Sequence, residues 1–398
     1  MLAKQMKFIE KTSFATSGQE LLLRAALLDG ADAVDALKEW ESVADLENQL
    51  EAGTFDLLPL LYMNMQRLGV EYSKMNKLKG IYRQVWYKNQ RYFSDAGRVL
   101  DSLHKAGTRT MVIKGVPLKI LYYKNYGVCL IPRIDILVPS SQALLAIDSL
   151  KKTGWDPTDT SVKEHMLYRP SLQFINESGI NLELHWNLIF KSFCFDSDSG
   201  FWDKAVPVKI HDVATYAPDA TDMLFHVIVS GTTLDPDQSV HWIADAMTII
   251  QSSHLEIDWS RMVHHAKKHL VFLEIKEALN YLHETFKAKM PKTIIDSFKH
   301  IPVSFLEQIE YQRLNSKHKA HHETLLGGLP LYLIEYLRLT RDTGVLPALA
   351  GFPWYLKYRL HEKNFLNLFF SLILRIMKTA RKKLSGIISH VSGVIHEA

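Results

Sequence analysis

The stretch IPRIDILVP, residues 131–139, has the pattern of a buried β-strand that carries one carboxylate. Residues 134–138 are apolar except for Asp135, and a proline lies near each end of the stretch. Arg133 stands two residues before the aspartate, so the two side chains would share one face of the strand. A metal-binding Asp-x-Asp pair that has lost one member would give this pattern, and so would a strand with an Arg–Asp ion pair.

Residues 109–216, which surround this strand, alternate between two kinds of pattern. Short segments rich in β-branched or large apolar residues predict strands over 110–115, 133–138, 171–176, 180–186 and 205–210. Helical patterns occupy 116–125 and 140–155, and Gly154 is placed to end the second helix. The order strand, helix, strand, helix and then several strands predicts a mixed sheet.

The regions on either side of this sheet have helical periodicity. Apolar residues recur at three- and four-residue steps from residue 18 to about 105 and again from 219 onward. We therefore predict an α+β fold in which a small mixed β-sheet core, 106–218, lies between an N-terminal helical region, 1–105, and a C-terminal helical region, 219–398. No fixed-period repeat or low-complexity linker occurs, so we expect the three regions to pack together.

Composition narrows the class of protein. The chain has 398 residues, of which 47% are hydrophobic and 23% charged, as in ordinary globular proteins. Its net charge of +4 is small for this length, and we expect no nucleic-acid partner. The two cysteines, Cys129 and Cys194, are too few for a disulfide framework or a thiolate zinc site. A cytoplasmic location is the natural expectation, and the N-terminus has no signal-peptide pattern.

The longest apolar run, FLNLFFSLILRIM at 365–377, is shorter than the ~20 residues that a membrane-spanning helix needs. Four basic residues follow it between 378 and 383. Two interpretations fit this pattern. The run is either a helix docked on the protein core, which is the commoner arrangement, or a basic amphipathic helix that makes a weak contact with a membrane surface through residues 365–383.

Three positions in the predicted sheet carry chemistry that could act together. Lys114 and Gly115 end the first strand just before a helix, where backbone amides and a lysine can approach a phosphate. Glu183 lies on the fourth strand, and if that strand neighbours the second, Glu183 and Asp135 can share a divalent ion. The alternative is that Asp135 pairs with Arg133 and that Glu183 is a charge on an edge strand.

Three runs in the middle of the chain together resemble a known family: LHKAGTRTMVIKGVPLKILYY, RIDILVPSSQALLAIDSLKKTGW and INLELHWNL. This is the uncharacterised nucleotidyltransferase family of bacteria, in the polymerase-β-like superfamily. The family shows a Leu-Lys-Gly junction, an Arg-x-x-x-Asp-x-Asp strand, a Leu-x-x-x-Gly-Tyr/Trp helix end and an Asp-Leu-His-Trp strand. The resemblance extends over most of residues 20–290.

The resemblance implies roles for individual residues. Lys114 and Gly115 match the family's phosphate-side junction, and Asp135 matches the second aspartate of its metal pair. Glu183 takes the place of the third carboxylate, and His185 either contacts the nucleotide or acceptor or orients Glu183. The implied cofactor is Mg²⁺ or Mn²⁺, held by Asp135 and Glu183. The implied substrate is a nucleoside triphosphate, and the acceptor is a small molecule, a glycan or a peptide.

Two positions depart from the family pattern. Arg133 replaces the first aspartate and Cys129 replaces the upstream arginine. The first change moves the local charge by two units in the positive direction and opposes tight two-metal binding. Two hypotheses follow. Either the site is partly degenerate and still transfers a nucleotidyl or phosphoryl group, with Arg133 holding a phosphate, or the protein is a catalytically inactive module that binds a nucleotide or a biosynthetic partner.

Overall fold

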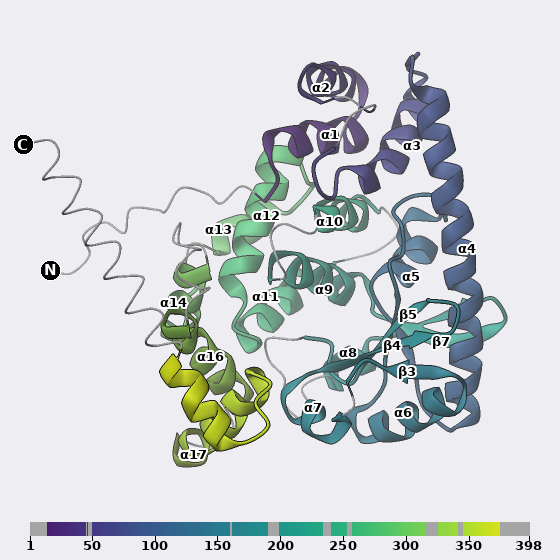
Figure 1. The fold of residues 1–398 in the computed structure, drawn as a ribbon. Coiled ribbons are helices and arrows are strands. Elements are labelled where there is room, and N and C mark those ends of the chain that lie inside the picture. Colours follow the sequence, from purple (N-terminus) through teal and green to yellow (C-terminus); the bar gives the residue numbers. More distant parts are fainter. Residues whose placement is uncertain are drawn as a thin grey trace, which may run out of the picture. The chain divides into compact units, whose positions relative to one another are not determined.

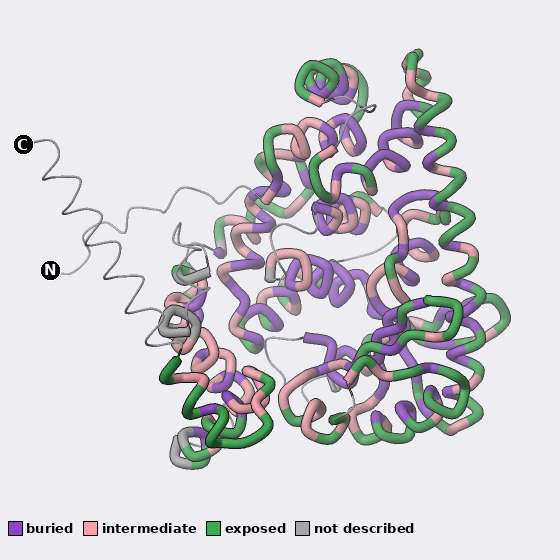
Figure 2. The backbone as a smooth tube through the Cα atoms, in the orientation of Figure 1, coloured by how far each residue is buried: buried purple, intermediate pink, exposed green. Residues whose placement is uncertain are grey.

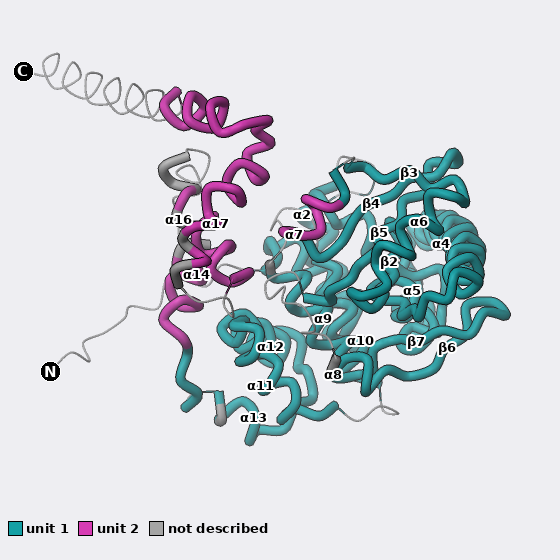
Figure 3. Tube along the Cα trace, turned by 90° about the horizontal axis from the view of Figure 1, so that it is seen from below, with its two compact units in different colours: residues 1–162, 169–190, 195–303 teal, residues 163–168, 191–194, 304–398 magenta. Residues whose placement is uncertain are grey.

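The computed structural model describes residues 14–44, 46, 50–159, 161–189, 199–233, 240–252, 257–298, 300–314, 325–340 and 345–374. The chain divides into two compact units (Figure 3). The first unit comprises residues 1–162, 169–190 and 195–303, and the second comprises 163–168, 191–194 and 304–398. The predicted boundaries at residues 105 and 218 separate regions of different secondary structure, whereas these two units are separated by compactness. The predicted boundaries therefore stay a prediction.

A seven-stranded mixed sheet forms the centre of the first unit, in the order β3-β4-β5-β2-β1-β7-β6. Its strands are β1 Met111–Val112, β2 Ile134–Leu137, β3 Trp155–Pro157, β4 Ser171–Asn176, β5 Asn181–His185, β6 Val206–Ile210 and β7 Val213–Ala217. Two neighbouring pairs, β2 with β5 and β1 with β7, are parallel, and the other pairs are antiparallel. With the helices around it, this sheet confirms the predicted α+β class.

All five predicted strands occur, and two further strands, β3 and β7, were not predicted. β3 has only three residues, among them an aspartate and a proline, so it carries no alternation to recognise. β7 forms a hairpin with β6 through a turn in which His211 adopts a φ of +50°. A histidine in that conformation gives no sequence signal of the Asn-Gly kind that marks a tight hairpin.

The region before the sheet is helical, as the periodicity from residue 18 to about 105 predicts. Its α-helices are α1 Ser17–Leu27, α2 Gly30–Val43, α3 Leu58–Leu68 and α4 Met75–Lys105. Thr16 and Gln19 form a capping box at the start of α1, and Gly69, with a φ of +66°, ends α3. The helical pattern over residues 31–53 predicts a longer helix than α2, which stops at Val43.

Inside and after the sheet, helices pack on both of its sides. Those of the first unit are α5 Gly115–Pro117, a π-helix η2 Leu118–Tyr123, α6 Ala143–Lys152, α8 Ser199–Asp203, α9 Ala220–Thr233, α10 His241–Gln251, α11 Trp259–Lys268, α12 Phe272–Phe286 and α13 Lys292–Ser297. The long helix α4 contacts β6, β7 and α6, and α9 lies on the other side of the sheet (Figure 1). Much of α9 is buried (Figure 2), with Leu224 and Ile228 fully so.

The second unit is helical in its described part. It contains most of α7 Val162–Tyr168, together with α14 Phe305–Leu314, α16 Leu325–Leu339, α17 Val345–Arg359 and a helix over 365–374. Its small core includes Tyr336, Ala348 and Tyr355. None of the helices in the described part of the chain combines the length and the apolarity needed to cross a bilayer.

Asn89, a fully buried residue of α4, fastens the loop that leads into β2. Its Nδ2 donates to the carbonyl oxygens of Tyr126 at 2.7 Å and Cys129 at 3.1 Å, and its Oδ1 accepts from the backbone N–H of Ile131 at 2.8 Å. Cys129 has a φ of +51° in this loop, so the three bonds hold a backbone conformation that is unfavourable for a non-glycine residue.

We predict that Asn89→Ala lowers the free energy of unfolding by about 2–4 kcal/mol, because three backbone groups of the loop lose their partner in a buried place. The measurement is the urea midpoint of the full chain by circular dichroism. Ser94→Ala, an exposed change on the same helix, is the control and should leave the midpoint unchanged. Equal midpoints for the two variants would show that the loop does not depend on Asn89.

Candidate functional site

Asp135 and Glu183 lie directly beside each other in the middle of the sheet. β2 and β5 are adjacent and parallel, and their register pairs Asp135 with Glu183. Residues paired in register point to the same face of a sheet, so the condition for a shared carboxylate site is met. Glu183 is not an edge-strand charge, because β5 lies between β4 and β2. That alternative was wrong, whereas the ion pair between Asp135 and Arg133 does form.

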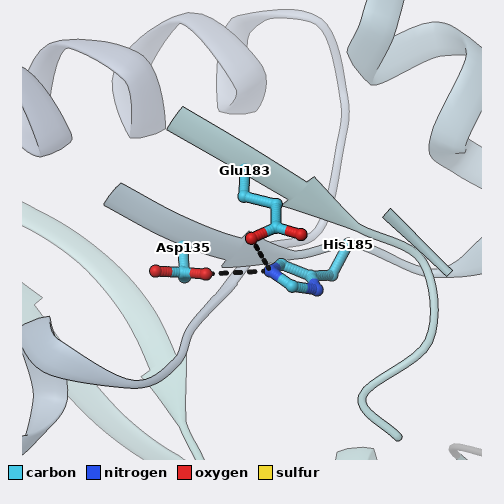
Figure 4. A group of neighbouring side chains, drawn as sticks. All are labelled: Asp135, Glu183 and His185. Atoms are coloured by element: carbon cyan, nitrogen blue, oxygen red, sulfur yellow. Dashed lines mark hydrogen bonds and ion pairs between the residues drawn. The ribbon is translucent and has the colours of Figure 1, made fainter. Parts of the chain in front are cut away.

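His185 joins the two carboxylates from the same strand as Glu183. Its Nε2 lies 3.0 Å from Asp135 Oδ1 and 3.7 Å from Glu183 Oε2 (Figure 4). Ser171, on the neighbouring β4, donates from its hydroxyl to Glu183 Oε1 at 2.6 Å. The donor atoms that Asp135, Glu183 and His185 offer all lie within 4.8 Å of one another.

Two cations are paired with these carboxylates. Lys114 Nζ lies 2.7 Å from Asp135 Oδ1 and 3.6 Å from Glu183 Oε2. Arg133 bridges the same two groups, with Nε 3.2 Å from Asp135 Oδ1 and a terminal guanidinium nitrogen 2.6 Å from Glu183 Oε2. Two positive and two negative side chains therefore balance in one cluster, which we call the ion-pair cluster: Lys114, Arg133, Asp135 and Glu183.

Lys114 reaches the cluster from a strained backbone. It has a φ of +58° and a ψ of −126°, immediately before α5. A non-glycine residue in such a conformation costs about 1–3 kcal/mol, and residues of this kind gather at ligand sites. In this conformation Lys114 forms a 2.7 Å ion pair with the buried carboxylate of Asp135.

Both carboxylates are held in the ionised form. Burial opposes ionisation of Asp135, which is 3% exposed, but the charge of Lys114 and the hydrogen bond from His185 keep its pKa well below the ordinary value. Burial also acts against ionisation of Glu183, and the nearby charges of His185, Lys114 and Arg133 outweigh it, so that the pKa of Glu183 is lowered too. The cluster is a fixed arrangement of charges at neutral pH.

The donor set of Asp135, Glu183 and His185 fits one divalent cation. Adjacent ligands of a cation with bonds of ~2.1 Å lie roughly 3 Å apart, close to the 3.0 and 3.7 Å that separate His185 Nε2 from the two carboxylates. Two carboxylate oxygens suit Mg²⁺ or Mn²⁺, and the imidazole nitrogen favours Mn²⁺ over Mg²⁺. A cation bound there competes with the side chains of Lys114 and Arg133 for the carboxylates.

Gly115 has a packing reason to be glycine. A Cβ at this position would lie 3.3 Å from Ile131 Cγ1, which is tighter than ordinary contact. The helix that it begins, α5, has three residues and continues into the π-helix η2. A role of the Gly115 amide toward a phosphate therefore stays a prediction.

Asp245, on α10, accepts a hydrogen bond from the Tyr123 hydroxyl at 2.8 Å and has a structural partner there.

His226, on α9, was not predicted from the sequence as part of this region. It is 2% exposed, and among the described residues its Nδ1 has no hydrogen-bond partner. Burial lowers its pKa to about 3, and the charges of Lys114 and His185 act in the same direction. A histidine in an apolar helix gives the same pattern as any core residue, so no sequence signal distinguishes it.

We predict that His226 makes the fold sensitive to mild acid. The unfolded chain binds a proton at this histidine below its ordinary pKa of 6.5, whereas the folded chain does not until about pH 3. Stability is therefore lost as pH falls through this window, by about 1.4 kcal/mol for each pH unit below 6.5. In His226→Gln, the difference in urea midpoint between pH 7.5 and pH 5.5 should shrink.

The control for this experiment is His264→Gln, which removes an exposed histidine of α11. Because this side chain is exposed, the urea midpoints of the variant at pH 7.5 and pH 5.5 should match those of the wild type. An unchanged pH dependence in His226→Gln itself would mean that His226 accepts a proton in the folded protein.

Comparison with known proteins identifies the family of this chain. The model of a family described as "Uncharacterised nucleotidyltransferase" matches residues 50–287, more than half of the chain and all of the ion-pair cluster. A solved antigenic nucleotidyltransferase-like protein from Paracoccidioides brasiliensis is similar at 12% identity with a TM-score of 0.32, over 52% of this chain and 96% of that one. No curated protein matches the chain. The chain belongs to the uncharacterised nucleotidyltransferase family.

Proposed function

We propose that this protein binds a nucleoside triphosphate together with Mg²⁺ or Mn²⁺ and transfers a nucleotidyl or phosphoryl group to an acceptor. The observation that carries the proposal is the pair of buried carboxylates on adjacent parallel strands, Asp135 and Glu183, with His185 beside them. The family match supports the reaction class. The polymerase-β-like superfamily, and a small molecule, glycan or peptide as acceptor, belong to the same proposal.

Asp135, Glu183 and His185 would hold the cation in this proposal. A divalent ion bound there neutralises charge on the triphosphate and polarises the phosphorus that is attacked. The protein's own groups do the rest of the positioning. Lys114 supplies a compact charge for a phosphate oxygen, and Arg133 supplies a planar guanidinium that can bind two phosphate oxygens at once.

Binding of substrate then exchanges the partners within the ion-pair cluster. In the structure, Lys114 and Arg133 bind carboxylates. Phosphate oxygens compete for the two cations, and each cation that turns to a phosphate releases a carboxylate oxygen. In nucleotidyl transfer the acceptor hydroxyl oxygen bonds to the α-phosphorus, the bond to the β-phosphate oxygen breaks, pyrophosphate leaves, and the hydroxyl proton passes to solvent.

We predict that Asp135→Asn lowers nucleotide consumption by about 100-fold or more, because the site loses one of its two ionised carboxylates. The assay incubates the full chain with labelled nucleoside triphosphates and Mn²⁺ or Mg²⁺ and separates the products by chromatography. Asp156→Asn, an exposed change on β3 of the same sheet, is the matched control. Turnover by Asp135→Asn at the wild-type rate would remove Asp135 from the site.

A second function, that of a catalytically inactive binding module, is favoured by one observation. The Arg133 guanidinium bridges both carboxylates and, together with Lys114, neutralises them without a metal ion. A protein of this kind would recognise a nucleotide or a biosynthetic partner without turnover. Calorimetry separates the two functions, because a binding module takes up nucleotide with the same affinity whether or not a divalent cation is added.

We predict that Arg133→Asp raises the affinity for Mn²⁺ by about tenfold or more, because a cation beside the two carboxylates is replaced by a third carboxylate. Isothermal titration with MnCl₂ alone measures the change. Arg83→Asp, an exposed arginine of α4, alters the net charge by the same amount and should leave Mn²⁺ affinity at the wild-type value. An Arg133→Asp titration that matches wild type would show that Arg133 does not restrain metal binding.

A further inference from the structure

The helix over residues 365–374 in the second unit presents apolar side chains to solvent. Of its ten residues, only Leu368 is buried. The exposed large side chains are Phe365 at 43%, Leu366 at 70%, Phe369 at 59%, Phe370 at 60%, Ile373 at 36% and Leu374 at 64%. Within the described part of the second unit, most apolar residues of this helix are therefore not packed against a core, although the commoner interpretation of the run predicts such packing.

These six residues form one continuous face. With about 100° between successive residues of an α-helix, positions 365, 369, 373, 366, 370 and 374 follow one another around roughly half of its circumference. Leu368, the buried residue of the helix, lies outside this arc. The outward face contains no charged residue. This pattern is the reverse of a surface helix, whose polar face points to water.

Trp354 of α17 extends this face. It is 55% exposed, and its ring packs edge-on against Phe365 with the centroids 4.9 Å apart. We call these seven residues, Trp354 with the six exposed residues of the helix, the apolar face. Contiguous exposed patches of this kind mark sites that bind another surface, and tryptophan and phenylalanine are typical of the interface between lipid headgroups and acyl chains.

The charge of the neighbouring sequence indicates what covers the apolar face. From residue 363 to residue 396 there is no aspartate or glutamate, and residues 363–383 contain six cations: Lys363, Arg375, Lys378, Arg381, Lys382 and Lys383. Residues 375–398 lie outside the described residues, and their charge is fixed by the sequence. A partner with negative charge and an apolar interior complements both features, and an anionic lipid bilayer has both.

We propose that the apolar face inserts into the surface of an anionic lipid bilayer and that the basic residues that flank the helix in the sequence bind the lipid headgroups. The apolar run at 365–377 is shorter than the ~20 residues that a membrane-spanning helix needs, so the apolar face would lie in the plane of the membrane interface instead of crossing it. Apolar insertion supplies the affinity, and the cations direct the helix to anionic lipids. The proposal is independent of the nucleotide site.

Flotation of the full chain with vesicles tests the proposal. Vesicles of phosphatidylcholine with 30% phosphatidylglycerol should carry the protein upward at low salt, and pure phosphatidylcholine vesicles should bind at least about tenfold less, as should anionic vesicles in 0.5 M NaCl. The double variant Phe369→Ser with Phe370→Ser should lower the vesicle-bound fraction by about tenfold or more, because two inserted rings are lost.

The matched control is Leu144→Ser with Leu145→Ser, which removes two half-exposed leucines of α6 in the first unit and should bind vesicles like wild type. Light scattering during gel filtration tests a second copy of the chain as the occupant. A dimer that the Phe369 and Phe370 changes dissociate, in a protein that does not float with anionic vesicles, would overturn the proposal. Equal binding to neutral and anionic vesicles would overturn the role of the cations.

Discussion

Two carboxylates buried side by side, at Asp135 and Glu183, impose the constraint on which the arrangement of the site depends. The parallel pairing of β2 and β5 places them on one face of the sheet, in register. Two like charges in a buried place destabilise each other and the fold unless cations compensate them. Lys114 and Arg133 supply this compensation from the end of β1 and the start of β2.

The two cations are placed by segments with unfavourable backbone conformations. Lys114 adopts an unfavourable backbone conformation just before α5. The loop before Arg133 contains Cys129 with a positive φ, and Asn89 holds that loop from α4 through three hydrogen bonds. Both segments that carry the cations therefore contain an unfavourable backbone conformation, whereas the two carboxylates lie on regular strands. This distribution is expected where side-chain placement, rather than backbone stability, determines the conformation.

The sequence predicted those parts of the fold that depend on local pattern. β4 lies where alternating apolar residues placed it, at 171–176, and helices such as α4 extend over the predicted residues. Strand order is not a local property. Nothing in the residues around Glu183 indicates that β5 lies between β4 and β2, and only this order excludes an edge-strand charge. His226 was missed for the same reason, since its place near the site depends on how α9 packs.

Arg133 illustrates how both interpretations of a short motif can hold at once. The residue pairs with Asp135, as an ordinary strand ion pair would, and it also contacts Glu183, the second carboxylate that would hold a shared cation. Sequence spacing showed that Arg133 and Asp135 share a face of the strand. The ion pair between Arg133 and Glu183 could not be predicted without knowing that β5 lies beside β2. The resemblance to a family with an aspartate at this position identified the difference, and the structure gives its geometry.

Under the proposed function, charge balance in the ion-pair cluster would link the binding of cation and nucleotide. Two side-chain cations and two carboxylates make the nucleotide-free cluster neutral. A divalent cation entering alone would leave a buried net charge of two positive units, and a triphosphate entering alone would leave an excess of negative charge, both unfavourable in a place of low dielectric. Entry of both together lets the carboxylates bind the metal while Lys114 and Arg133 bind phosphates. Arg133 therefore disfavours metal binding on its own more than it disfavours metal binding with nucleotide.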